Sequence, residues 1–194
     1  MKKFKLATLL KIAILGAISF LIMMVDFPLW FAPSFYEIDF SDVPALIGAF
    51  SLGPLAGIII ELIKNILNVA LTGSITGGIG EVANFIIGAM FVGTAGIIYK
   101  KNKTRKSAII GMAVGTILMA IVGSALNYYV LLPLYSKIMP IETILDMAKA
   151  VNNIVVDLKT LVIYTVFPFN LIKGLVVSLL TIPLYKRLSK VLGE

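Results

Sequence analysis

A few polar and ionisable side chains stand inside long apolar runs of this 194-residue chain. Charged groups within membrane-spanning segments are costly, and they are usually paired or functional. Amides donate and accept hydrogen bonds, carboxylates accept them and ammonium groups donate them, so such a set suits a polar ligand held by hydrogen bonds. The set comprises Glu61, Lys64, Asn65, Asn68, Glu81, Asn84, Asn127, Asn170 and Lys173.

The same composition argues against catalysis. The chain has no His and no Cys, so it lacks the commonest general base and any thiolate nucleophile or metal ligand. A G-x-x-x-x-G-K-[ST] phosphate loop is absent, and the Gly-rich stretch over 73–80 lacks the strand-to-helix context of such a loop. Paired catalytic carboxylates are not evident either. We therefore expect no catalytic residue, no metal and no cofactor.

The elements that must position these residues are membrane helices. Hydrophobic residues make up 59% of the chain and charged residues 14%, whereas a soluble domain is about one quarter charged. A spanning helix needs about 20 apolar residues, which predicts an all-α integral membrane protein: one domain over 1–194 with six transmembrane helices in a compact bundle. The short run over 43–52 could instead form one re-entrant element with 54–71. The predicted helices lie at about 5–25, 43–52, 54–71, 81–99, 107–135 and 161–185.

Three basic clusters predict the orientation of the bundle. They lie at 2–5, 100–106 and 186–190 and contain most of the 17 Lys and Arg residues. Cationic loops resist translocation, so we expect both termini in the cytoplasm of a multi-pass plasma-membrane protein. This topology explains the net charge of +7, and no nucleic-acid partner is expected. The run over 6–25 is long for a signal peptide, and we interpret it as a retained first helix.

The orientation places the polar residues in the outer half of the bundle or its middle. At a rise of about 1.5 Å per residue, Asn127 lies about 12 Å and Lys173 about 18 Å below the outer ends of their helices. Lys173 is too deep to reach either surface, so a ligand or a buried partner is expected for it. An amide-lined pocket that opens to the outside is the simplest arrangement.

Structural roles compete with ligand binding at the other positions. Glu61 and Lys64 are spaced i, i+3 and can pair with each other. Asn65, Asn68 and Asn84 can join helices by hydrogen bonds. Asn170 can satisfy backbone groups freed near Pro168. The aromatic residues of the first outer loop, over 26–42, can form an interfacial belt, although this explains the interleaved acids less well.

Six segments carry a pattern that extends over nearly the whole chain: 39–46 (DFSDVPAL), 53–57 (GPLAG), 64–65 (KN), 83–85 (ANF), 127–135 (NYYVLLPLY) and 168–174 (PFNLIKG). Taken in this order, they resemble the riboflavin-specific substrate-binding (S) components of energy-coupling factor (ECF) transporters. The segments with Asn127 and Lys173 are the most specific. Ala13 and Ala17, four residues apart, resemble the docking motif of the family.

The resemblance implies a six-helix S component in the lipid bilayer that captures riboflavin outside the cell. Its partners would be a transmembrane coupling subunit, which Ala13 and Ala17 would face, and two ATP-binding subunits. In that family the S component is thought to topple in the membrane and release the vitamin inside. FMN is a possible ligand, although the acids over 39–42 should disfavour its phosphate.

The chemistry of riboflavin agrees with this implication. The flavin ring is flat and largely apolar, and it suits an apolar pocket with a few polar groups. Asn127 can donate and accept at the imide edge of the ring, and Lys173 can donate to a carbonyl or ring nitrogen. Aromatic side chains can cover the ring faces, and acids and amides can bind the ribityl hydroxyls. The expected ligand-binding residues are Asp39, Phe40, Ser41, Asp42, Lys64, Asn65, Glu81, Asn84, Asn127, Tyr128, Asn170 and Lys173.

Two other functions compete with this one. An S component for another vitamin is the nearest alternative. The second is an integral membrane enzyme acting on a lipid, with Glu61, Glu81 or Asp39 as acid or base. The absence of His and of repeated acidic motifs argues against that enzyme.

Overall fold

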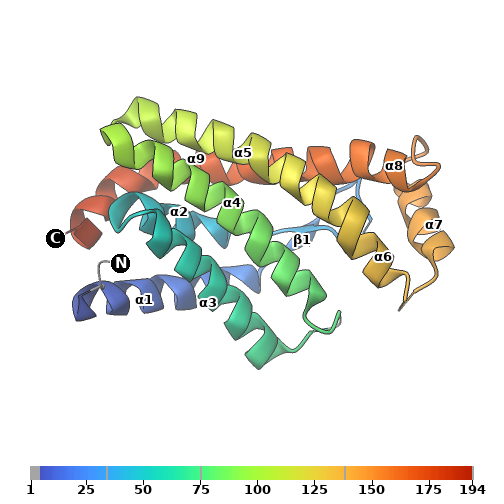
Figure 1. The fold of residues 1–194 in the computed structure, drawn as a ribbon, viewed down its shortest axis with the longest axis horizontal. Helices are drawn as coiled ribbons and strands as arrows, with labels where there is room; N and C mark the ends of the chain where they lie inside the picture. The colour runs from blue at the N-terminus through green and yellow to red at the C-terminus, as the bar shows by residue number, and fades with distance from the viewer. Residues whose placement is uncertain (1–4, 34, 75, 138, 194) are drawn as a thin grey trace.

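The computed structural model describes residues 5–33, 35–74, 76–137 and 139–193, and they form an elongated helical bundle (Figure 1). Within these residues, five helical segments are long and apolar enough to cross a membrane: Leu6–Met23, Pro54–Thr72, Ile79–Asn102, Arg105–Tyr135 and Leu158–Leu188. The elements in chain order are α1 (Leu6–Met23), β1 (Phe27–Pro28), β2 (Glu37–Ile38), α2 (Asp42–Ser51), α3 (Pro54–Thr72), α4 (Ile79–Asn102), α5 (Arg105–Leu126), η1 (Asn127–Leu131), α6 (Leu132–Tyr135), α7 (Ile141–Val151), α8 (Leu158–Leu161), η2 (Val162–Val166) and α9 (Phe167–Gly193).

The predicted second helix corresponds to α2, which has only 10 residues and is not one of the five long segments. It rises about 15 Å, roughly half the hydrocarbon thickness. Residues 42–50 are all buried, because α2 packs against α1, α3, α4 and α9. Gly53, with a φ of 107°, separates α2 from α3, so the two form distinct helices joined by a tight turn.

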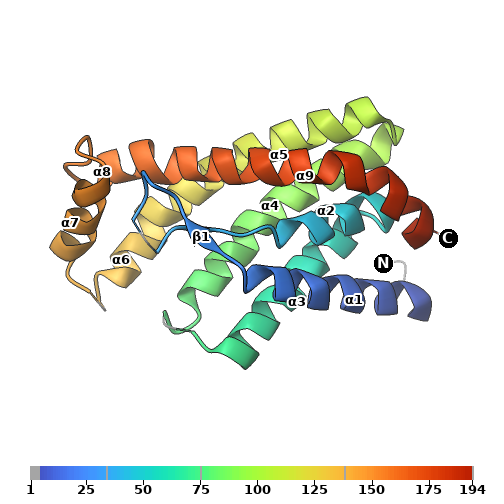
Figure 2. The ribbon, with the colours of Figure 1, turned by 180° about the vertical axis from the view of Figure 1, so that it is seen from behind.

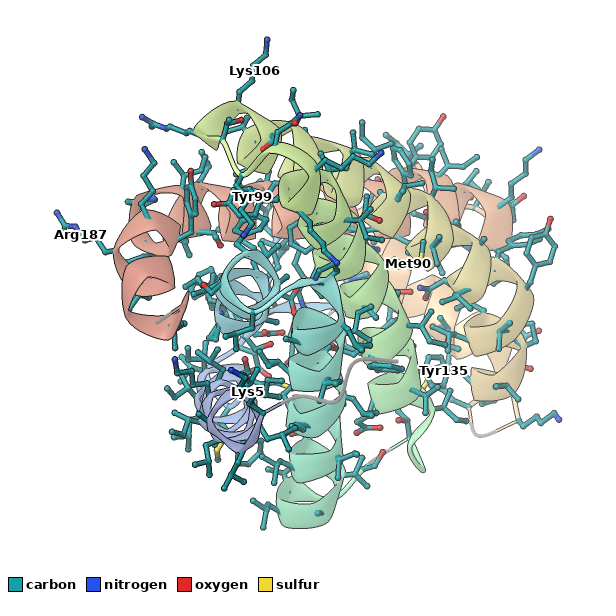
Figure 3. All side chains as sticks on the ribbon, turned by 60° about the vertical axis from the view of Figure 1, so that its left-hand side comes forward. Lys5, Met90, Tyr99, Lys106, Tyr135 and Arg187 are labelled. Carbon is teal, nitrogen blue, oxygen red and sulfur yellow. The ribbon has the colours of Figure 1, made fainter. Side chains whose placement is uncertain are left out.

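The three basic clusters gather at one end of the bundle. Figure 1 shows the two termini and the turn between α4 and α5 at the same end. Figure 3 labels Lys5, Lys106 and Arg187 there, one from each cluster. Lys2 and Lys3 of the first cluster lie outside the described residues. The helix ends that face away from this basic end are the C-terminal ends of α1, α3 and α6 and the N-terminal end of α4 (Figures 1 and 2).

Small residues allow α4 and α5 to approach closely along their length. A Cβ atom added to Gly111 would lie 2.8 Å from the carbonyl oxygen of Ala95, and one added to Gly115 would lie 2.8 Å from that of Phe91. These are contacts with helix backbone, which cannot move aside as a flexible side chain can. The two glycines therefore set the distance between the helices that carry Asn84 and Asn127.

We expect Gly111→Val to force α4 and α5 apart and to lower the free energy of unfolding by about 1–3 kcal/mol, the usual cost of overpacking. Ala113→Val is the matched control, because Ala113 is exposed on the same helix. Thermal unfolding of the two variants in detergent measures the difference. Equal melting temperatures would show that the helices are free to separate at this contact.

Candidate ligand-binding cavity

A cavity of about 720 Å³ lies between the helix ends that face away from the basic end. Its wall includes Met23 at the end of α1, Thr72 at the end of α3, Glu81 in the first turn of α4 and Tyr135 at the end of α6. Figure 3 shows Tyr135 well removed from Lys106 and Arg187. The volume lies in the range of about 300–1,000 Å³ that is typical of small-molecule sites.

One side of the cavity is built by the segment between α1 and α2. In Figure 2 this segment leaves α1, runs toward α8 and returns to α2. Strands β1 and β2 pair antiparallel, with Phe27 opposite Ile38 and Pro28 opposite Glu37, which makes the return fixed rather than loose. Asp39 follows β2 directly and Asp42 begins α2, and both lie on the cavity wall.

Lys173 and Asp39 form a buried ion pair on this wall. Lys173 Nζ lies 2.9 Å from Asp39 Oδ2 and 4.0 Å from Asp42 Oδ2, and the side chains of Lys173 and Asp39 are only 7% and 6% exposed. The backbone N–H of Ser41 donates to Asp39 Oδ1 at 2.7 Å. Burial disfavours the charged form of Asp39, but the nearby Lys173 and Lys64 ammonium groups outweigh it, so the pKa of Asp39 falls below its usual range.

A second ion cluster lies behind the wall, around the fully buried Lys64 of α3. Its Nζ donates to Ser41 Oγ at 2.8 Å and to an oxygen of Asp42, and it lies 2.8 Å from Glu61 Oε2. The ammonium group thus donates two hydrogen bonds, to Ser41 and Asp42, and Glu61 adds an ion-pair contact. The i, i+3 pair of Glu61 and Lys64 that the sequence suggests is present.

Asn127 and Tyr36 meet at another part of the cavity wall. The Tyr36 hydroxyl donates to Asn127 Oδ1 at 2.8 Å, and Asn127 Nδ2 donates to the Gly123 carbonyl at 2.9 Å. Asn127 begins the π-helical segment η1, a widened turn of the kind often found at functional sites. Burial raises the pKa of Tyr36 well above its ordinary value, so it stays a neutral donor.

Asn170 approaches the same region from α9. Its Nδ2 donates to the Val166 carbonyl at 2.9 Å, a contact with the backbone four residues earlier. A Cβ atom on Gly123 would lie 3.0 Å from Asn170 Nδ2, so glycine at this position leaves the room that the amide occupies. Phe169, which packs against Tyr36 in a tilted arrangement at a centroid distance of 5.5 Å, adds an aromatic face to the wall.

The Gly-rich turn forms the remaining polar edge. Glu81 Oε2 accepts a hydrogen bond from Ser74 Oγ at 2.8 Å, and the Gly80 N–H donates to Thr76 Oγ1 at 2.9 Å. Glu81 and Asn84 both line the cavity from the start of α4. From the segment over 136–160, Met139 and Ile144 reach the wall.

A family model described as "ECF transporter, substrate-specific component" matches residues 7–185. The chain belongs to this family. It is therefore the S component of a transporter and not an enzyme, as predicted, and the lipid-modifying alternative is set aside. Its membership also agrees with the several apolar helices of a membrane protein.

Three relatives place the chain within the family more closely. It is 44% identical over 184 residues to "Riboflavin transporter RibU" of Staphylococcus aureus, covering 95% of this chain and 91% of that protein. It is 38% identical over 175 residues to "Riboflavin transporter FmnP" of Bacillus subtilis, covering 90% and 87%. A solved structure described as "Structure and mechanism of the S component of a bacterial ECF transporter" shares 40% identity and a TM-score of 0.76, covering 96% of this chain and 98% of that one.

The S component brings seven of the twelve expected ligand-binding residues to the cavity wall and places five elsewhere. Lys64 and Ser41 lie behind the wall in the ion cluster. Asn65 donates from Nδ2 to the Glu61 carbonyl, which is a contact within its own helix. Phe40 packs against Phe27, and Tyr128 is 38% exposed beside Tyr129. The seven residues on the wall are Asp39, Asp42, Glu81, Asn84, Asn127, Asn170 and Lys173.

Sequence reasoning missed Tyr36 and Phe169. Tyr36 was grouped with the interfacial aromatic residues of the first outer loop, because nothing in its neighbourhood distinguishes it from them. Phe169 stands next to Asn170 within one of the six matching segments, so its position beside a candidate residue was the available signal. Both side chains lie on the cavity wall.

We expect Asp39→Asn to destabilise the fold strongly, because it leaves the Lys173 ammonium group buried without its closest carboxylate. Breaking a buried ion pair typically costs about 3–5 kcal/mol. Asp146→Asn is the matched control: Asp146 is 75% exposed and lies 3.8 Å from Lys149, and an exposed pair contributes about 0–1 kcal/mol. Unfolding by denaturant compares the two variants, and a small effect of Asp39→Asn would show that water reaches Lys173.

Proposed function

We propose that this S component binds riboflavin in the 720 Å³ cavity, as the substrate-binding subunit of an ATP-driven vitamin importer. The observation that carries the proposal is the convergence of Asn127, Asn170 and Lys173 from α5–η1 and α9 on one cavity with the aromatic residues Tyr36 and Phe169. The two relatives named riboflavin transporters, at 44% and 38% identity, support the choice of ligand.

The polar groups on the wall suit the parts of riboflavin. Asn127 uses one lone pair and one proton within the protein, which leaves one of each for the imide edge of the ring. Lys173 keeps protons beyond the one it gives to Asp39, and these can reach a ring carbonyl or nitrogen. Glu81, Asn84 and Asp42 supply acceptors and donors for the ribityl hydroxyls. Tyr36 and Phe169 offer aromatic faces to the ring.

The proposed topology has six membrane helices, with α2 as the short second one and both termini in the cytoplasm. Support comes from the gathering of the basic clusters at one end, since cationic segments stay inside. The cavity at the other end then faces outward and receives the vitamin from outside the cell. The plasma membrane is the location that this topology requires.

We expect Lys173→Met to weaken riboflavin binding at least tenfold, because the ring loses a charged donor in a desolvated pocket. Lys159→Met, which removes an exposed cation of α8, is the matched control. Quenching of riboflavin fluorescence by the purified protein measures both affinities, and a melting curve reports whether each variant is folded. Unchanged affinity in folded Lys173→Met would refute the site. If the wild-type protein binds another vitamin and does not bind riboflavin, that vitamin is the ligand instead.

The remaining partners are a transmembrane coupling subunit and two ATP-binding subunits, with α1 as the docking helix. Ala13 and Ala17 are both exposed on α1, which is consistent with close approach of another helix. We expect Ala13→Trp with Ala17→Trp to abolish riboflavin uptake by cells without changing the affinity of the purified protein. Ala113→Trp, on the exposed face of α5, is the control. Uptake that survives the double substitution would exclude this face of α1.

A further inference from the structure

Lys64 occupies an unusual place for a charged residue of a membrane bundle. It is 0% exposed and does not touch the cavity. It donates hydrogen bonds to Ser41 and Asp42 at the start of α2, and it forms an ion pair with Glu61 of its own helix α3. Ser41 and Asp42 belong to the turn that also carries Asp39. The ammonium group therefore holds the segment that carries the cavity carboxylates against α3.

Two short connections join Lys64 to Lys173. The first is a chain of hydrogen bonds: Lys64 donates to Ser41 Oγ, the Ser41 N–H donates to Asp39 Oδ1 at 2.7 Å, and Asp39 Oδ2 accepts from Lys173. The second is a single carboxylate. Asp42 bonds Lys64 through Oδ1, while its Oδ2 lies 4.0 Å from Lys173 Nζ. Asp42 is thus shared between a lysine behind the wall and a lysine on it.

This sharing governs how much of the Lys173 charge is available to a ligand. Asp42 Oδ2 is buried and has no hydrogen-bond partner in the described residues, and Asp42 is 1% exposed. While Lys64 neutralises Asp42, Lys173 is engaged mainly by Asp39. Without Lys64, the buried Asp42 carboxylate would need another cation, and Lys173 is the nearest one on the wall.

We propose that Lys64 is a positioning residue of the binding site, which holds Asp42 and Ser41 so that the Lys173 ammonium group stays directed at the ligand. The inference rests on the proposed function, with riboflavin as the ligand. It differs from a purely structural role, because a structural ion pair would affect folding and leave the affinity of the folded molecules unchanged.

A double-mutant cycle on riboflavin affinity tests the proposal. Lys64→Met should weaken binding about tenfold in the wild-type background. In the Asp42→Asn background it should weaken binding less than about twofold, because the Asp42 carboxylate that would attract Lys173 is absent. Glu61→Gln is the matched second background: it removes the other carboxylate beside Lys64, and there Lys64→Met should still cost about tenfold. Equal effects of Lys64→Met in all three backgrounds, or no effect in any of them, would overturn the proposal.

Two further measurements keep the test decisive. If Lys64→Met does not fold, Ser41→Ala removes one neutral acceptor of Lys64 and should weaken binding by the folded protein about twofold or more; unchanged affinity would count against the proposal. If the wild-type protein does not bind riboflavin, the proposed function fails by itself. The positioning role is then read from the ¹⁵N resonance of the Lys173 ammonium group without ligand, which should move in Lys64→Met and stay in Glu61→Gln. No shift in Lys64→Met would overturn it.

Discussion

The structure depends on one constraint: charges that are buried in an apolar bundle need partners of opposite sign within reach. Five charged residues of the described chain are buried, each 5% exposed or less when the whole residue is counted: Asp39, Asp42, Glu61, Lys64 and Lys173. The two lysines come from α3 and α9, and only Glu61 lies on the same helix as either of them. The other two carboxylates must be brought in from elsewhere in the chain, because an unpaired ammonium group at this depth would be very costly.

The path between α1 and α2 follows from this requirement. The chain could connect two antiparallel helices with a few residues, yet it uses the segment over 24–41, with a two-stranded pairing, to return into the bundle. There it places Asp39 against Lys173 and Asp42 between both lysines. Helix α2 starts at this buried point rather than at a membrane surface, which explains why it is short and why it is apolar on every side.

The sequence predicts the positions of the helices well, but it predicts poorly which distant side chains pair with each other. Apolar runs and breakers such as Gly53–Pro54 place most helix ends within a few residues, because hydropathy and helix propensity are local properties. The end of the last helix is wrong, since it was predicted near residue 185 and α9 continues to Gly193. The Glu61–Lys64 pair is also local and follows from its i, i+3 spacing. By contrast, Asp39 and Lys173 are 134 residues apart, and Tyr36 and Asn127 are 91 apart. No periodicity connects such pairs, so the sequence alone does not show which side chains pair across the bundle.

The family resemblance added to this local information, since its motifs predict that Asn127 and Lys173 bind the ligand together. It did not separate residues on the cavity wall from those behind it, because a motif preserves both kinds equally. Phe40 and Ser41 belong to the same matching segment as Asp39 and Asp42, yet only the two aspartates line the cavity, while Phe40 packs against Phe27 and Ser41 contacts Lys64. Ser41 and Asp42 contact Lys64 behind the wall. The Asp42 carboxylate also lies near Lys173, so it faces both the buried ion cluster and the binding site. The boundary between binding site and scaffold therefore passes through a single side chain, which is why the two cannot be altered independently at this position.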